Sequence, residues 1–234
     1  MSIRLLLINP NTTASMTESM AEAARVVARP DTQITAVTVT NSLPFIDGWY
    51  DETIAAAAVA QCVHERAGTF DAAIIACFGD PGLYAARELT SAPIIGIAEA
   101  SFLLAMTLGH RFGIISTIDR ATPATYDLLR HYGVDGRCAA IEASGAEVLE
   151  LHGDPSAMLR GLEEAGRRAI AAGAEVLCMG CGAMISIRAE LESRLGVPVV
   201  EAVPAAIVYA EALVSLGLST SKIRSFAPPS TILS

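Results

Sequence analysis

The sequence has 234 residues, of which 52% are hydrophobic, enough chain to bury one large core or two smaller ones. A formal net charge of -9 and the lack of any run of Lys or Arg argue against nucleic-acid and anionic-membrane partners, so we expect a small-molecule ligand. Five cysteines, an odd number, argue against a disulfide framework, and no segment reads as a signal peptide or a membrane span; we therefore expect a cytoplasmic protein with reduced thiols.

Short apolar runs alternate with Ala-rich stretches of helical period, a pattern typical of parallel sheets with helices on both faces. In chain order, the predicted strands are Arg4–Ile8, Gln33–Thr38, Ala72–Ala76, Ile94–Ile97, Phe112–Ser116, Ala139–Ala143, Val176–Met179 and Val197–Val200. The predicted helices are Thr13–Ala28, Thr53–Arg66, Leu83–Leu89, Ala100–Leu108, Thr122–Tyr132, Ser156–Ala172, Ser186–Leu195 and Ala205–Leu216. Asp80, followed by Pro81, is the predicted N-cap of the third helix.

The two halves of the sequence resemble each other. FDAAIIACFGD aligns with AEVLCMGCGAM, which brings Cys77 opposite Cys181. Upstream, RLLLINPNT aligns with RFGIISTID, and downstream Pro93 falls opposite Pro198. This pattern indicates an internal duplication.

The predicted fold is therefore α/β, with two pseudosymmetric Rossmann-like α/β halves at residues 1–109 and 110–215 and a C-terminal tail at residues 216–234. The C-terminal helix is expected to pack back onto the first half. Ligands bind outside the carboxyl ends of strands in open α/β sheets, so two facing halves predict an interdomain active site.

Cys77 and Cys181 each follow the end of an apolar strand and are expected to line this cleft from opposite sides. The other thiols, Cys62, Cys138 and Cys178, are interpreted as small hydrophobes of the core. Cys178 and Cys181 also form a C-x-x-C pair, which leaves a redox dithiol open as an alternative.

No cofactor or metal is expected. The first strand is followed by NPNTT rather than by G-x-G-x-x-G, and no G-x-x-x-x-G-K-[ST] occurs. A zinc site needs further ligands near the C-x-x-C pair, and the histidines are scattered singly along the chain at His64, His110, His131 and His152.

Two facing thiols suit the inversion of a carbon centre that bears an acidic proton. One thiolate removes the proton from one face while the opposite thiol supplies a proton to the other. Backbone N–H groups after each cysteine, at Phe78–Asp80 and Gly182–Ala183, are placed to receive the charge that spreads onto an adjacent carbonyl.

The segments INPNTT, IACFGDPGL, PIIGIAEA, GCGAM and LVSLGLSTSK resemble, in this order, the hydantoin/allantoin racemase branch of the cofactor-independent aspartate/glutamate racemase superfamily. The resemblance runs over essentially the whole chain. It implies a two-domain pseudosymmetric fold, a homo-oligomer, and racemisation by two cysteines that are here Cys77 and Cys181.

The resemblance also implies a set of substrate-binding residues. The NPN loop contributes Pro10 and Asn11, and the equivalent strand end of the second half contributes Thr117. The CFGD motif contributes Phe78, Gly79 and Asp80, and the GCGAM motif contributes Gly182 and Ala183. The PFIDGWYDE loop contributes Phe45 and Trp49. Tyr50 joins Phe45 and Trp49 as a possible wall for a hydrophobic ring substituent. Ala183 departs from the family pattern, which has glycine there.

The expected function is racemisation of 5-substituted hydantoins, with allantoin as the nearest alternative substrate. A maleate isomerase or an amino-acid racemase of the same superfamily stays open as a further alternative. A non-enzymatic thiol sensor that uses Cys178 and Cys181 is the alternative from another class.

Overall fold

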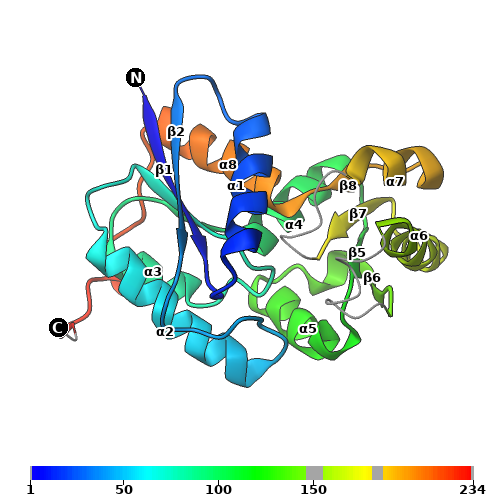
Figure 1. Cartoon of the computed structure of the whole chain (residues 1–234), viewed down its shortest axis with the longest axis horizontal. Helices are drawn as coiled ribbons and strands as arrows, with labels where there is room; N and C mark the ends of the chain where they lie inside the picture. Colours follow the sequence, from blue (N-terminus) through cyan, green and yellow to red (C-terminus); the bar gives the residue numbers. More distant parts are fainter. Residues whose placement is uncertain (1, 146–154, 181–186, 233–234) are drawn as a thin grey trace.

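The computed structural model describes residues 2–145, 155–180 and 187–232. It has two four-stranded parallel sheets, one in each of two lobes (Figure 1), so the predicted pair of α/β halves is confirmed. The strands are β1 (Ile3–Asn9), β2 (Thr32–Thr38), β3 (Ala72–Ile75), β4 (Ile94–Gly96), β5 (Phe112–Ser116), β6 (Cys138–Ala143), β7 (Val176–Met179) and β8 (Val199–Val200). The α-helices are α1 (Ala14–Val27), α2 (Trp49–Glu65), α3 (Leu83–Leu89), α4 (Ile97–Leu108), α5 (Thr122–His131), α6 (Pro155–Ala171), α7 (Arg188–Leu195) and α8 (Ala202–Ser215). Within the described ranges, no helix combines the length and the apolar character that a bilayer crossing requires.

The two sheets repeat one another in strand order and in register. The orders are β2-β1-β3-β4 and β6-β5-β7-β8. Leu5 pairs with Ala72 in the first sheet, and the residues aligned with them, Phe112 and Val176, pair in the second. The backbone N–H of Ala73 bonds to the carbonyl of Pro93, as that of Leu177 does to Pro198. The duplication visible in the sequence is therefore a duplication of the sheet.

The inner strands β1, β3, β5 and β7 are buried on both faces, which explains why they are almost continuously apolar. In β1, Leu5 and Leu7 pack in a core shared with α1, α4 and α8, whereas Leu6 and Ile8 point to the opposite face, against α2 and α3. In β5, Ile114 belongs to the shared core and Ile115 packs against α6 and α7.

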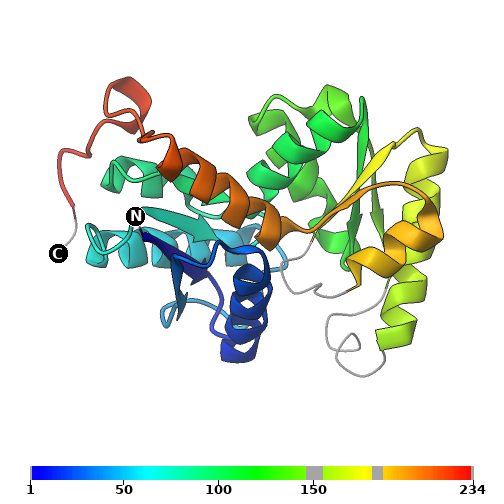
Figure 2. The same ribbon diagram turned by 90° about the horizontal axis from the view of Figure 1, so that it is seen from above.

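Helices α4 and α8 join the two halves. Helix α4 contacts β5, β7 and β8 of the second sheet as well as β4 of the first. Helix α8 leaves β8 and returns along α1, α4 and the first sheet (Figure 2), where the carboxylate of Glu211 accepts hydrogen bonds from the N–H of Arg29 and the hydroxyl of Thr32. The division of the chain at residues 109 and 110 stays a prediction, because α4 packs on both sheets.

Helices α2, α4 and α8 begin three or four residues earlier than the sequence predicts, α8 at Ala202 rather than Ala205. Helix α2 begins at Trp49 rather than Thr53, because its first turn is supplied by Asp51 and Glu52, whose charges suit a helix N-terminus. Helix α4 begins at Ile97 rather than Ala100, and no residue next to it in the sequence supplies a side-chain cap.

The cap of α4 comes from Asp80. Its carboxylate accepts hydrogen bonds from the N–H groups of Ala98, at 3.1 Å, and Glu99, at 2.9 Å. Gly96 makes this approach possible, since a Cβ there would lie 2.1 Å from the Asp80 carboxyl carbon. The prediction that Asp80 caps the helix that follows it is wrong: the N-cap of α3 is Gly82, and Asp80 itself has a left-handed φ of 46°.

Asp80 also ties the second half to the first. The hydroxyl of Tyr132, which follows α5, donates a hydrogen bond of 2.7 Å to the same carboxylate. Burial raises the pKa of Asp80 to about 7, while these hydrogen bonds act in the opposite direction. Because the pKa of Asp80 is higher in the folded than in the unfolded protein, protonation of this carboxyl stabilises the fold. This stabilisation is fully present at pH values below the pKa of the unfolded state and is lost as the pH rises through about 7.

We expect Tyr132→Phe to lower the free energy of unfolding by about 1.5–3 kcal/mol, the range for a hydrogen bond to a charged acceptor. The loss should be larger at pH 8 than at pH 5, because the hydroxyl stabilises the ionised carboxylate more than the protonated one. Urea unfolding at both pH values measures it. Tyr126→Phe, at an exposed position of α5, is the matched control; equal losses for the two variants would contradict the assignment.

Candidate functional site

A cavity of about 360 Å³ lies between the two halves. Four central strands reach it with residues at or just beyond their carboxyl ends: Asn11 after β1, Cys77 after β3, Thr117 after β5 and Gly180 after β7. Helix α2 and the loop before it form one further wall, and helix α5 forms another. The cleft predicted between the strand ends is therefore present in the structure.

Cys77 occupies a fixed turn at this cavity. The N–H of Ala76 still bonds to the carbonyl of Ile8, so Cys77 is the first residue beyond the sheet ladder. The N–H of Asp80 closes the turn onto the Cys77 carbonyl at 3.0 Å. Between them, the amides of Phe78 and Gly79 donate no hydrogen bond within the described structure, and both residues line the cavity. These two N–H groups can therefore donate to a ligand oxygen.

The NPN loop is held by a buried polar network. The side-chain amide of Asn9 donates to Asn11 Oδ1 and to Thr17 Oγ1, both at 2.9 Å. Asn11 Oδ1 also accepts from the N–H of Thr13 at 2.9 Å. The Asn11 side-chain nitrogen contacts the sulfur of Met16, a weak acceptor, at 3.6 Å, so it retains donor capacity towards the cavity that Asn11 lines.

The cavity wall from α2 carries a carboxylate that sequence reasoning did not single out. Glu52 lines the cavity next to the Cys77 turn, and a Cβ on Gly79 would lie 2.8 Å from Glu52 Oε1. Burial, and then the neighbouring charge of Asp51, raise the pKa of Glu52. Asp47 and Asp127 also line the cavity, whereas no lysine or arginine of the described chain does.

The structure brings together most of the predicted site residues that it describes. The residues that line the cavity are Asn11, Phe45, Trp49, Cys77, Phe78, Gly79 and Thr117. Trp49 lines it with only part of its side chain, because it is 58% exposed. The ring of Phe78 also packs edge-on against Phe102, with ring centroids 5.5 Å apart.

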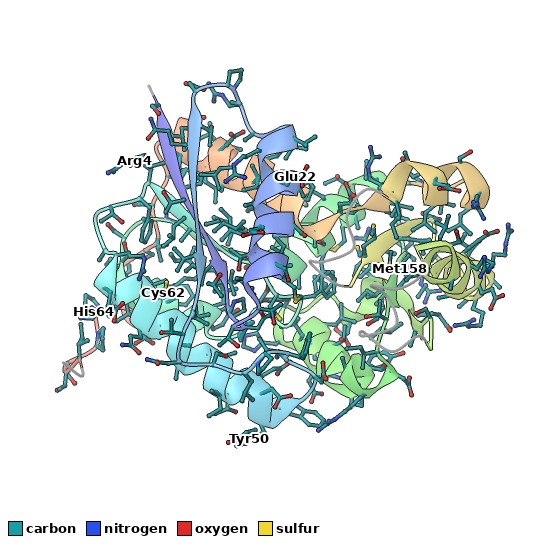
Figure 3. All side chains as sticks on the ribbon, in the orientation of Figure 1. Arg4, Glu22, Tyr50, Cys62, His64 and Met158 are labelled. Carbon is teal, nitrogen blue, oxygen red and sulfur yellow. The ribbon has the colours of Figure 1, made fainter. Side chains whose placement is uncertain are left out.

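Three residues that were expected at the site do not line this cavity. Asp80 is buried and turns away from the cavity to cap α4. Pro10 is buried between the two asparagines of the loop and does not line the cavity. Tyr50 is 73% exposed and projects outward from the first turn of α2 (Figure 3), because the helix begins before it. Cys181, Gly182 and Ala183 lie outside the described residues.

The remaining cysteines differ from Cys77 in their surroundings. Cys178 lies in β7 with no exposed surface, and its sulfur lies 3.7 Å from the carbonyl of Ser101; burial raises its pKa. Cys62 is buried in α2, and partly buried Cys138 has a pKa raised to about 11 by burial. Among residues 2–145, 155–180 and 187–232, no three His, Cys, Asp or Glu side chains converge as a metal site.

Glu52 was missed because acidic residues in a helix read as a solvated face. The position of Glu52 relative to the start of the helix could have indicated its role. A helix that begins at Trp49 places Glu52 in its first turn, beside the loop that forms the cavity wall. His131 was expected on a helix surface; it is exposed at the end of α5 and also borders the cavity.

Comparisons with known proteins agree with this arrangement. A hydantoin racemase from Pseudomonas sp. (strain NS671) is 39% identical over 97% of this chain and 92% of its own. The structure of an allantoin racemase from Pseudomonas fluorescens superimposes with a TM-score of 0.95 and 42% identity, covering 99% of both chains. An allantoin racemase from Klebsiella pneumoniae superimposes with a TM-score of 0.93 and 40% identity, covering 100% of this chain and 96% of the other.

The likeness extends over both halves of the duplicated sheet and over the cavity between them. Residues 5–210 match the Asp/Glu/Hydantoin racemase family, a range that begins in β1 and ends within α8. On this full-length match, the chain belongs to the Asp/Glu/Hydantoin racemase family.

Proposed function

We propose that the protein racemises 5-substituted hydantoins by proton transfer between Cys77 and Cys181. Membership of the family, together with relatives that are named racemases, makes the protein an isomerase of the racemase type. The observation that carries the finer proposal is the position of Cys77 in the cavity at the end of β3. The equivalent strand β7 leads to Gly180, which lines the same cavity and directly precedes Cys181 in the sequence.

The proposed reaction needs one base and one acid. The thiolate of one cysteine takes the proton from C5 of the ring, and the electron pair of the C–H bond passes into the adjacent carbonyl as an enolate. The thiol of the other cysteine then returns a proton to the opposite face of C5. The cysteines exchange protonation states, and the next turnover can run in the reverse direction without any oxidant or cofactor.

Backbone donors near Cys77 support this assignment. Phe78 and Gly79 line the cavity and their amides have no hydrogen-bond partner in the described structure, and Asn11 lines the same cavity. Neutral N–H donors of this kind stabilise charge on an enolate oxygen, and they cost no reorganisation because the turn is already closed by Asp80.

The charge of the cavity favours a neutral substrate. Asp47, Glu52 and Asp127 line it, and the described residues contribute neither lysine nor arginine to its lining. A dicarboxylate such as maleate, or the carboxylate of a free amino acid, would lie near these acidic groups with no lysine or arginine among the described lining residues to compensate the charge. A hydantoin ring instead offers carbonyls to the N–H donors and N–H groups to the carboxylates.

The thiol-sensor alternative is disfavoured by the burial of Cys178. A redox dithiol needs an accessible thiolate of low pKa, and burial raises the pKa of Cys178. Allantoin remains a second candidate substrate, because two solved allantoin racemases match the fold at TM-scores of 0.95 and 0.93. The apolar contribution of Phe45, Ile46 and Met16 to the lining favours hydrophobic ring substituents over a ureido group.

Loss of optical rotation from single enantiomers tests the substrate class. We expect turnover of benzyl- and isobutyl-hydantoin, slower turnover of allantoin, and none of glutamate or aspartate, because only the neutral rings match the cavity charge. The assay is run with a chelator present. Turnover of an amino acid at a rate equal to that of the hydantoins would contradict the proposal.

Replacement of the cysteines tests the two-base assignment. Cys77→Ser and Cys181→Ser should each lower kcat about 10²- to 10⁴-fold, because each removes one of the two groups that move the proton. Cys62→Ser and Cys138→Ala are matched controls and should keep nearly full activity. A Cys181→Ser variant with a tenth of the wild-type rate in both directions would show that a single base suffices.

A further inference from the structure

The carboxylate of Glu52 lies at the cavity and has no partner among the residues that the structure describes. It lines the cavity with Cys77, and Gly79 leaves the space that its Oε1 occupies. Within the described structure, its side chain makes no hydrogen bond and no ion pair. Carboxylates that are partly removed from water without a partner are unfavourable, so this group is available to a ligand.

The charged and titratable groups around Glu52 do not neutralise it. Asp51 precedes it on α2 and Asp47 lies in the loop before the helix. Cys77 borders the cavity from the turn after β3, and Asp127 and His131 border it from α5. The guanidinium of Arg120 lies against Gly48, one turn before Glu52, and does not line the cavity.

The position of Glu52 fits a hydrogen bond to a neutral N–H group of the substrate. The amides of Phe78 and Gly79 are donors and suit the carbonyl oxygens of a ring, so the N–H groups of the same ring need an acceptor. Glu52 is an acceptor beside that turn. A ligand with a free carboxylate would instead meet a like charge in a partly desolvated site.

Building on the proposed function, we infer that Glu52 selects cyclic ureides: it accepts a hydrogen bond from a ring N–H and repels the ring-opened N-carbamoyl amino acids. These differ from hydantoins by one added water, which converts a ring carbonyl to a carboxylate and opens the ring. Discrimination between them matters because the two share the same substituent and the same carbamoyl group. The assignment makes Glu52 a substrate-binding and specificity residue, with the proton transfer left to the cysteines.

Glu52→Gln separates these effects in the full chain, because glutamine keeps the shape and loses the charge. We expect the Kd of benzylhydantoin, measured by calorimetry, to rise about tenfold or more. The Kd of N-carbamoylphenylalanine should fall by a similar factor, since the repulsion is removed. Glu65→Gln, at the far end of the same helix and away from this cavity, should leave both values within about twofold of wild type.

The pH dependence gives a readout that a purely structural role would not move. Because the pKa of Glu52 is raised, its carboxylate takes up a proton at a higher pH than an exposed glutamate does. Wild-type affinity for benzylhydantoin should therefore weaken, and affinity for the carbamoyl acid strengthen, as the pH is lowered from about 7.5 to about 5. Both trends should be absent in Glu52→Gln.

The inference is supported if Glu52→Gln shifts the Kd values of the two ligands in opposite directions while Glu65→Gln leaves both unchanged. Unchanged Kd values, parallel shifts for both ligands, or equal effects of the two variants overturn it. The proposed function fails separately, if the wild-type protein binds benzylhydantoin but does not racemise it. Wild-type protein that binds no hydantoin at all would overturn both.

Discussion

The buried carboxylate of Asp80 holds the parts of the cavity in place. The backbone N–H of Asp80 closes the turn that begins at Cys77, while its carboxylate caps the first turn of α4 by accepting hydrogen bonds from the N–H groups of Ala98 and Glu99. The same carboxylate accepts a hydrogen bond from the hydroxyl of Tyr132, which follows α5. Helix α4 spans the two sheets, and α5 forms a wall of the cavity. One residue therefore couples the Cys77 turn to the packing of both halves, although Asp80 does not itself line the cavity.

Complementarity in this site comes from groups that the fold leaves unpaired. Most backbone N–H groups donate hydrogen bonds within helices or sheets. The amides of Phe78 and Gly79 lie between the end of β3 and the start of α3 and make no such bond in the described structure. The Glu52 carboxylate faces them from α2. Donors and an acceptor on adjoining walls fit a flat ring that carries both carbonyl and N–H groups, and the two strand ends with equivalent register fit a reaction that treats both faces of that ring alike.

Local sequence was sufficient for the sheets and insufficient for the links between them. Parallel strands buried on both faces are continuously apolar, and the duplication aligned Leu5 with Phe112 and Pro93 with Pro198. The two matching halves and the cavity at their strand ends could therefore be predicted. The start of α4 could not be predicted, because Asp80, which caps it, lies in another segment of the chain. Its carboxylate can approach only because residue 96 is a glycine and has no side chain. Glu52 escaped prediction for the same reason: only the packing of α2 against the Gly79 turn distinguishes it from a solvated helix residue.

The measurement that tests the two-base account most directly is the origin of the new C–H bond. One pure enantiomer of benzylhydantoin is converted in D2O, the reaction is stopped at low conversion, and the deuterium at C5 of each separated enantiomer is determined against an enzyme-free control. If separate thiols serve the two faces, the donor has already exchanged with solvent; the product enantiomer should carry deuterium and the recovered substrate should carry little. Appreciable original protium in the product would mean that one base serves both faces and would contradict the roles given to Cys77 and Cys181.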